Sequence, residues 1–215
     1  MQKRKLVDYR QRHKRLRLLI SKLNKERRKQ AKKIDMLCND LIAAQRDFIR
    51  RLSTISFAAD FYKSIIGITD LGRLLSIASK LIKDELADAN ITYFLRHEDS
   101  FETHMSDTNT SIAVEGKRLE DYFTAGLLDN ICKSNKLCTL DEMFAMGLQG
   151  NLLQLNKISA FCVPLGSFGL PLGFILIYRS SKNKLTVDEL NKISAITWGL
   201  SRAIQSCQAP SHISD

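Results

Sequence analysis

The fold is decided by one stretch of the chain, Lys157-Ile-Ser-Ala-Phe-Cys-Val-Pro-Leu-Gly-Ser-Phe-Gly-Leu-Pro-Leu-Gly-Phe-Ile-Leu-Ile-Tyr178. A tight connection, Gly166-Ser-Phe-Gly169, divides it into two apolar runs, which predicts a β-hairpin. From Leu172 onward both alternating sets of positions are apolar, so the second strand needs cover on both faces of its sheet. We expect helices on one face and the irregular stretch before the hairpin on the other, with room there for a small cavity.

The chain before the hairpin supplies further strands and helices. Strands are expected at Ile91–Leu95 and around Phe101–Met105, followed by a loop at 106–115 that is rich in Ser, Thr, Asn and Asp. A helix with an apolar stripe is expected to start near Thr69-Asp70, and helical character returns between Arg118 and Cys132. These elements predict an α+β fold built on an antiparallel sheet.

Two capping boxes mark helices on either side of the hairpin. Thr139-Leu-Asp-Glu142 opens a short helix, and Thr186-Val-Asp-Glu189 opens a longer one. The apolar face of the second helix is made by Leu190, Ile193, Ile196, Leu200, Ala203 and Ile204. The chain therefore ends in an amphipathic helix that can cover the hairpin.

In this order, the elements resemble a GAF domain, the small α+β sensory module related to the PAS fold, over about residues 57 to 206. The segments that carry the resemblance are Thr69–Ile82, Asp88–Leu95, Val163-Pro-Leu165, Pro171–Ile177 and Leu185–Leu190. The resemblance implies that the first and last helices lie on one face of the sheet. It places a ligand pocket on the other face, under a roof made by about residues 101 to 154.

The resemblance also suggests which residues face that pocket, although it assigns no cofactor. From their placement beside the expected cavity, the candidate ligand-binding residues are Tyr93, Arg118, Tyr122, Phe144 and Phe161. The Asn-Lys-x-Phe-Asp signature of cyclic-nucleotide phosphodiesterase GAF domains is not visible, which argues against cyclic AMP or GMP. Bilin-binding relatives attach the chromophore to a cysteine followed by His or Tyr, and neither Cys132 nor Cys138 has such a neighbour.

Other chemical motifs have weaker support. Arg118-Leu-Glu-Asp121 matches the Arg-x-x-Asp pattern of some cyclic di-GMP receptors, but Arg96-His-Glu-Asp99 matches it too, so solvated charges are the preferred interpretation. Cys132 and Cys138 could support redox chemistry, although free cysteines are more often small core residues. No metal site is expected, because His97 and His104 lack further spaced ligands. No catalytic constellation is assigned, so the protein is expected not to be an enzyme.

The N-terminal segment carries a heptad repeat. Eighteen positions from Leu6 to Ile65 follow a spacing of three then four, and fourteen of them are apolar or tyrosine. No proline or glycine occurs before Gly67, so residues 1–66 are expected to form one long coiled-coil helix. A GAF-like domain at 67–207 and a disordered tail at 208–215 would follow.

A parallel homodimer is the simplest partner for this helix, and polar seam residues such as Arg27 and Gln30 can fix its register. The dimerisation seam is predicted to contain Leu16, Ile20, Leu23, Ile34, Leu37, Leu41, Phe48 and Ile55. The alternative is that the helix folds back on its own domain.

Charge is concentrated in the same segment. Residues 1–33 hold 15 Lys and Arg against two acidic residues, whereas the rest of the chain holds 18 basic and 21 acidic residues, a net charge of −3. The basic segment could therefore bind nucleic acid or an acidic protein, but a groove-reading helix would leave its partner where Leu16, Ile20 and Leu23 continue the seam. Nucleic acid is not favoured.

The sequence thus predicts a cytoplasmic, non-enzymatic sensory or regulatory protein. It would be a coiled-coil homodimer whose GAF-like domain binds a small molecule and signals to a separate partner. Its longest apolar run is about the length of a strand, and its five cysteines are an odd number with no zinc-like spacing, which fits a reducing compartment. The alternative is a structural adaptor, in which a ligand-free GAF-like scaffold carries a basic coiled coil that docks an acidic protein or nucleic acid.

Overall fold

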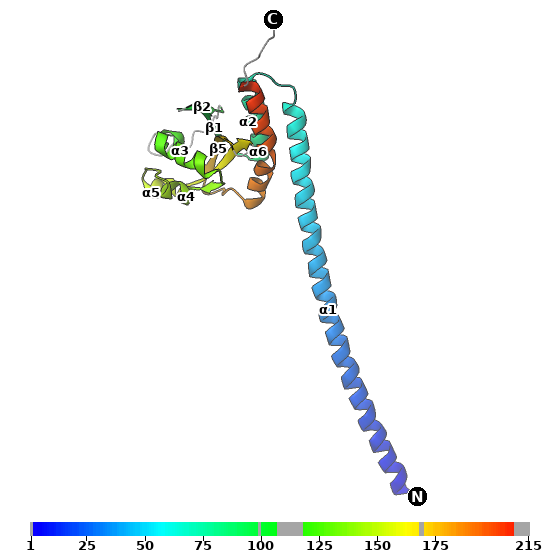
Figure 1. The fold of residues 1–215 in the computed structure, drawn as a ribbon. Coiled ribbons are helices and arrows are strands. Elements are labelled where there is room, and N and C mark those ends of the chain that lie inside the picture. The colour runs from blue at the N-terminus through cyan, green and yellow to red at the C-terminus, as the bar shows by residue number, and fades with distance from the viewer. Residues whose placement is uncertain (1, 99, 107–117, 168–169, 209–215) are drawn as a thin grey trace. The chain divides into compact units, whose positions relative to one another are not determined.

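The structure, a computed structural model, describes residues 2–98, 100–106, 118–167 and 170–208 (Figure 1). The chain divides into two compact units between Leu52 and Ser53. The first unit consists of the N-terminal part of helix α1, which as a whole runs from Gln2 to Ile65. The second unit holds the last turns of α1, a five-stranded sheet and the other helices.

The first unit is a single helix whose side chains are exposed wherever the structure describes them, from Gln11 to Leu52. The helix is uninterrupted because the sequence offers no glycine or proline until Gly67, where the backbone turns to a φ of 78°. All eight predicted seam residues are more than half exposed, so none of them is covered by the rest of the described chain.

The sheet of the second unit is antiparallel throughout, with the strand order β2-β1-β5-β4-β3. The predicted hairpin is confirmed, because β4 pairs with β5 from Ile158 opposite Ser180 to Ser167 opposite Leu170. The two predicted strands before it are confirmed as well and form a second hairpin. The strands are β1 (Asn90–His97), β2 (Ser100–Met105), β3 (Cys138–Thr139), β4 (Ile158–Ser167) and β5 (Leu170–Ser180).

One residue of the central strand must be glycine. Gly173 has a φ of 139°, and a Cβ atom built there would lie 2.0 Å from the carbonyl oxygen of Phe94 on β1. No L side chain fits both this conformation and this close approach. The Leu172-Gly173-Phe174 sequence therefore allows β5 to lie directly against β1.

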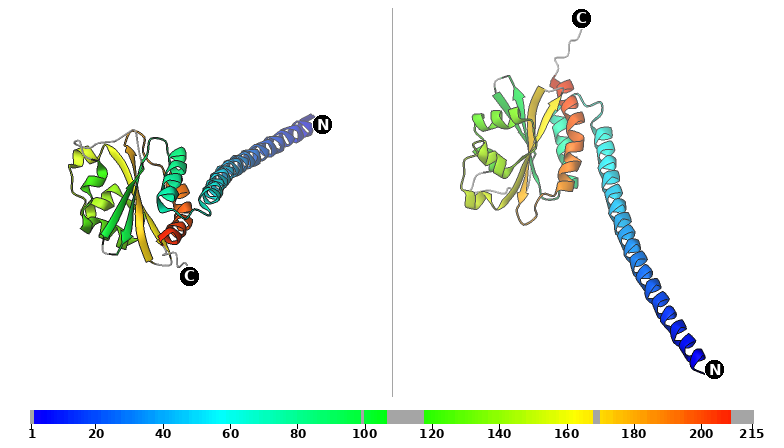
Figure 2. Two further views of the ribbon diagram at one scale, coloured as in Figure 1. Left: turned by 90° about the horizontal axis from the view of Figure 1, so that it is seen from above. Right: turned by 60° about the horizontal axis from the view of Figure 1, so that its bottom comes forward.

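Helices α2 (Leu71–Glu85) and α6 (Val187–Gln208) cover one face of the sheet, as predicted (Figure 2). Each begins at a side-chain cap: Asp70 accepts from the backbone N–H of Arg73 at 2.6 Å, and Thr186 forms the expected box with Glu189. Their apolar stripes meet odd-numbered residues of β1, β4 and β5 in a first core. The buried part of this side is apolar apart from a few hydroxyl groups and the buried Arg179 of β5, whose guanidinium pairs with Glu189 of α6 at 2.8 Å.

The opposite face is covered by short helices rather than by irregular chain alone. These are η1 (Leu119–Tyr122), α3 (Ala125–Ser134), α4 (Leu140–Ala145) and α5 (Leu152–Leu155). They pack on the even-numbered strand residues in a second core, and α4 begins at the predicted capping box of Thr139 and Glu142. The loop predicted at 106–115 lies outside the described residues except for Ser106.

The last turns of α1 belong to the first core. Phe61 and Ile65 are buried there, and Phe57, Ala58 and Tyr62 pack against it. The Tyr62 hydroxyl donates to the carbonyl oxygen of Ala195 on α6 at 2.7 Å. The helix ends at Ile65, next to the predicted division at 66/67, whereas the compact unit already begins at Ser53. Of the predicted tail, Gln208 is the last residue of α6, and 209–215 lie outside the described residues.

Candidate functional site

The five predicted ligand-binding residues lie on different sides of the sheet. Tyr93 and Phe161 belong to the first core, on the face of α2 and α6. Tyr122 and Phe144 are half-buried and pack against the second core, on the face of α3 and α4. Arg118 is exposed at the start of η1. The structure therefore does not bring the five residues together in one cavity.

Inside the second core, the structure reveals a buried polar cluster that the sequence did not suggest. The carboxylate of Glu120, on η1, accepts a hydrogen bond from the Thr92 hydroxyl on β1 at 2.5 Å. The Tyr178 hydroxyl on β5 donates to the same carboxylate at 2.9 Å. All three residues are buried, and a carboxylate is rarely buried without such donors.

The surroundings of Tyr178 raise the pKa of its hydroxyl group. Burial raises the pKa of the Tyr178 hydroxyl well above its ordinary value, and the nearby Glu120 carboxylate raises it further. The hydroxyl therefore keeps its proton and acts as a donor. Beside it on β1, Asn90 is buried, and its Nδ2 atom has no hydrogen-bond partner among the described residues.

Three phenylalanines lie at the other end of the same face. The rings of Phe94 and Phe123 are stacked with centroids 5.3 Å apart, and Phe174 packs against Phe94 at 5.0 Å. Aromatic contacts of this kind make a rigid apolar surface. The face of the sheet that the resemblance assigns to a ligand thus carries a hydrogen-bonded carboxylate and an aromatic cluster.

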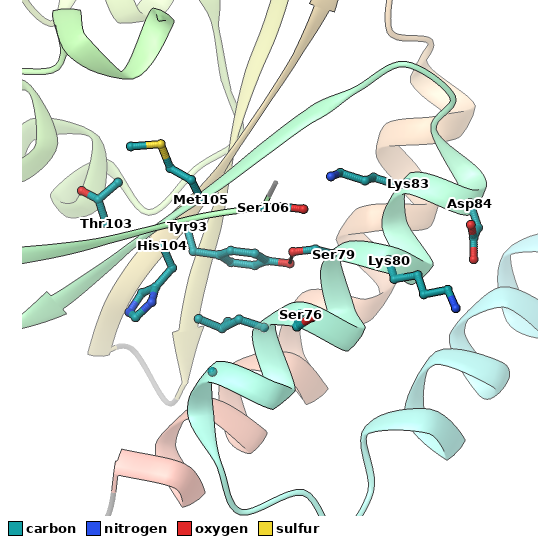
Figure 3. Close-up of a pocket in the computed structure, with 12 residues that line it drawn as sticks. Ser76, Ser79, Lys80, Lys83, Asp84, Tyr93, Thr103, His104, Met105 and Ser106 are labelled. Atoms are coloured by element: carbon teal, nitrogen blue, oxygen red, sulfur yellow. Dashed lines mark hydrogen bonds between the residues drawn. The ribbon is translucent and has the colours of Figure 1, made fainter. Parts of the chain in front are cut away.

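A second candidate site is an open groove between α2 and β2, with a volume of about 630 Å³ (Figure 3). The Tyr93 ring extends from β1 toward α2 and separates the two walls, and its hydroxyl accepts a hydrogen bond from Ser79 at 3.3 Å. Burial raises the pKa of the Tyr93 hydroxyl well above its ordinary value, although the Ser79 hydrogen bond lowers it in part. The groove is lined by Gly72, Leu75, Ser76, Ser79, Lys80, Lys83, Asp84, Tyr93, Thr103, His104, Met105 and Ser106.

The cysteines are all free. The two that are adjacent in the sheet are not the two that are near each other in the sequence. Cys138 on β3 lies directly opposite Cys162 on β4, whereas Cys132 is on α3. Burial raises the pKa of the Cys162 thiol well above its ordinary value and also raises that of Cys132. Protonated thiols are poor nucleophiles, so these cysteines have the character of core residues.

The remaining motifs take structural roles where they are described. Asp121 accepts a hydrogen bond from the backbone N–H of Arg118 at 2.9 Å, so this Arg-x-x-Asp match caps a short helix. The other match includes residue 99, which lies outside the described residues. His104 Nε2 lies 3.2 Å from a Glu102 carboxylate oxygen. Within the described ranges no group of three or more His, Cys, Asp or Glu side chains could hold a metal ion.

Solved structures with the same architecture identify the fold. The GAF domain of an Acinetobacter phosphoenolpyruvate-protein phosphotransferase matches with a TM-score of 0.53 and 14% identity, covering 74% of this chain and 97% of that chain. The corresponding domain from Coxiella burnetii matches with a TM-score of 0.53 and 13% identity, over 74% of this chain and 96% of that one. The second unit has the GAF fold.

Other matches carry the same fold in different proteins. The GAF domain of the cyanobacteriochrome TePixJ matches with a TM-score of 0.52 and 13% identity, covering 67% of this chain and 94% of that one. No family model matches the sequence, and no curated protein matches it. At such low identity the likeness is one of fold, and the function of this GAF unit has to be argued from its own residues.

No helix in the described part of the chain combines the length and the apolar character that a membrane crossing requires.

Proposed function

We propose that this chain is a non-enzymatic regulatory protein, in which α1 pairs two copies and each GAF unit senses a small molecule. The observation that carries the proposal is the heptad stripe of α1. It is exposed along the described first unit, and the same helix continues without a break into the core of the GAF unit. A change within the GAF core therefore has a direct mechanical route into the helix that would join the two copies.

The exposed stripe needs a partner for energetic reasons. A helix in water is only marginally stable by itself, and most helical stability in proteins comes from burying an apolar face. Each large apolar side chain that becomes fully buried contributes about 1.5–3 kcal/mol. The proposed seam residues have exposed fractions of 54% to 69% and are Leu16, Ile20, Leu23, Ile34, Leu37, Leu41, Phe48 and Ile55.

A second copy of the chain is the partner that fits the stripe best. The repeat of seven residues is the pattern that two supercoiled helices require, and a copy of the same helix presents the same pattern. A parallel arrangement would place two GAF units at the same end of the coiled coil. Arg27 and Gln30 would then meet their own counterparts in the seam and fix its register.

The sensory part of the proposal is supported by the second core. A small molecule that parted the helices over the second core would meet the Glu120 carboxylate with its hydroxyl donors and the rings of Phe94, Phe123 and Phe174, since Glu120, Phe94 and Phe174 are buried beneath those helices. Of the predicted ligand-binding residues, Tyr122 and Phe144 belong to this face. Among proteins with the same fold are a cyanobacteriochrome and a methyl-accepting chemotaxis protein. A ligand would act by binding more tightly to one arrangement of α1 than to another.

Seam substitutions test the pairing. Leu37→Asp places a charge at a seam position, and Asn39→Asp places the same charge two residues away, on the outer side of the heptad. Light scattering coupled to size-exclusion chromatography should give about twice the 24.4 kDa chain mass for the parent and for Asn39→Asp. Leu37→Asp should shift the mass toward a single chain. Equal masses for the two variants would contradict the proposed seam.

The adaptor remains a second candidate because of the charge on α1. The described residues from Gln11 to Lys33 are exposed and rich in Lys and Arg, so they could bind an acidic protein or nucleic acid. The two hypotheses differ in their response to salt. Added salt screens repulsion between the basic helices of a dimer and should strengthen pairing, whereas it weakens binding to nucleic acid through counterion release. A gel-shift titration at two salt concentrations, beside the mass measurement, separates them.

A further inference from the structure

The strand β2 lies at an edge of the sheet, and it offers backbone groups that β1 does not use. Among the described residues, only β1 pairs with it. The backbone N–H of Ser106 donates to the carbonyl oxygen of Ile91 at 3.1 Å. Because hydrogen-bonded and non-bonded pairs alternate along an antiparallel ladder, His104 also points its backbone groups toward β1. The N–H and C=O groups of Thr103 and Met105 therefore point away from the sheet.

Helix α2 runs beside this edge and forms the second wall of the groove in Figure 3. Tyr93 lies between the two walls, and Ser76, Ser79 and Ser106 add hydroxyl groups to the lining. A groove with an edge strand on one side and a helix on the other is suited to an extended peptide, which can join the strand through its main chain. The volume of about 630 Å³ leaves room for several residues.

Basic side chains lie on both faces of the edge. Lys83 belongs to the groove and, in Figure 3, extends from α2 toward Ser106. On the other face, Arg118 Nη1 lies 3.1 Å from the sulfur atom of Met105. The side chains of an added strand alternate between these two faces, so each set would meet a cation. Lys80 adds to the basic character of the groove, and the acidic residues near these cations in the described part of the chain include Asp84, Glu102 and Asp121.

We propose that the groove between α2 and β2 docks an acidic, extended segment of a partner protein by strand addition to β2. The outward backbone groups of Thr103 and Met105 supply the hydrogen bonds, and Lys83 and Arg118 select acidic side chains. This surface is distinct from the second core, to which the proposed small-molecule site belongs. Docking here does not depend on the sensory role of the GAF unit.

Two labelled peptides of eight residues test the site on the full chain. One alternates glutamate with valine, and the other alternates lysine with valine. Fluorescence polarisation should show binding of the glutamate peptide and at least 10-fold weaker binding of the lysine peptide. Lys83→Gln should weaken the glutamate peptide about 3-fold, as expected for one exposed charge pair, whereas the matched change Lys182→Gln in the β5–α6 turn should leave it unchanged.

Thr103→Pro tests the strand addition itself. Proline removes the outward N–H of Thr103 but no hydrogen bond between β1 and β2, so the sheet should remain folded, with an unchanged circular dichroism spectrum. The loss of one main-chain hydrogen bond should weaken the glutamate peptide about 10-fold. If Thr103→Pro unfolds the domain, protection of the Thr103 and Met105 amides from hydrogen exchange by the peptide decides instead.

Three outcomes would overturn the proposal. The first is equal affinity for the two peptides, and the second is an affinity that Thr103→Pro leaves unchanged while the domain stays folded. The third is complete displacement of the peptide by millimolar inorganic phosphate, which would indicate a site for small anions.

Discussion

The two parts of α1 carry the same heptad repeat and yet differ in what surrounds them. From Gln11 to Leu52 every side chain is exposed, whereas Phe61 and Ile65 are buried in the core of the GAF unit. The repeat continues across the division, because Ala58, Tyr62 and Ile65 fall on its next positions. A heptad stripe therefore specifies an apolar face without specifying which surface will cover it.

The difference lies in residues beside the stripe. Phe57 and Phe61 fall outside the heptad positions, and their rings lie 6.1 Å apart on the side of the helix that meets α2 and α6. They widen the apolar face beyond a two-position seam, and a wide face is typical of a helix packed in a globular core. The last turns thus pack on their own domain, and the exposed segment is the part that the proposed second copy would cover.

The largest expected effect compares one phenylalanine from each segment. Phe61→Ala removes a ring that is 1% exposed, and the cavity should lower the free energy of unfolding of the GAF unit by about 3–5 kcal/mol. Phe48→Ala removes a ring that is 61% exposed in the single chain and should change that free energy by less than about 0.5 kcal/mol. Urea denaturation followed by the fluorescence of the single tryptophan measures both.

The masses of the Phe61→Ala and Phe48→Ala variants in solution provide a second test of how the two segments differ. Phe48→Ala should weaken the dimer although it leaves the GAF unit intact, since Phe48 is a proposed seam residue. A Phe48→Ala variant with a destabilised GAF unit and an unchanged mass would mean that the two segments have been assigned the wrong partners.

A smaller effect tests how closely the end of α1 meets α6. A Cβ atom at Gly199 would lie 2.2 Å from the ring of Tyr62, so Gly199→Ala should cost about 1–3 kcal/mol through overpacking. Gly126→Ala, in α3, is the control, because a Cβ there meets nothing within 4 Å. It should be neutral or stabilise by up to about 1 kcal/mol. Thermal melting that ranks the two variants in the opposite order would contradict this packing.

The smallest effect concerns the start of α6. Burial raises the pKa of Glu189, but hydrogen bonds from Thr186 and Arg179 outweigh it and leave the pKa below the ordinary value of 4.5. A lowered folded pKa gives stability that is present above the unfolded pKa and lost as the pH falls through the folded one. Below about pH 4.5 the free energy of unfolding of the parent should therefore fall further than that of Glu189→Gln. The difference should be less than about 1 kcal/mol. If the urea midpoints of the parent and of Glu189→Gln changed with pH in parallel, the stabilising role assigned to Glu189 would be refuted.

Much of the fold could be predicted because its signals are local. The hairpin at 157–178 and the box at Thr186 each depend on a few neighbouring residues, and both lie where expected. The fate of Phe57 and Phe61 could not be predicted from the heptad pattern, because it depends on contacts with α2 and α6 more than ten residues away. The sequence predicts the long helix, but it does not predict which surfaces cover it.

The candidate sites were harder to predict, because they join residues distant in the sequence. Tyr93 and Phe161 were expected beside the cavity, yet strand alternation turns both toward α2 and α6. The polar cluster joins Glu120 to Thr92 and Tyr178 across three elements. The sequence contains one hint of this cluster. The polar residues Asn90 and Thr92 alternate with the apolar odd positions of β1, so the face of β1 that they share needs polar partners where it is buried.

Hydrogen exchange along α1, measured at two protein concentrations, tests the central claim most directly. The backbone amides of residues 57–65 should stay protected at both concentrations, because their cover belongs to the same chain. The amides of 11–52 should be protected at high concentration and should exchange faster on dilution, because the proposed cover of this segment is a second copy. Protection that is independent of concentration in both segments, or absent from 11–52 throughout, would contradict the account.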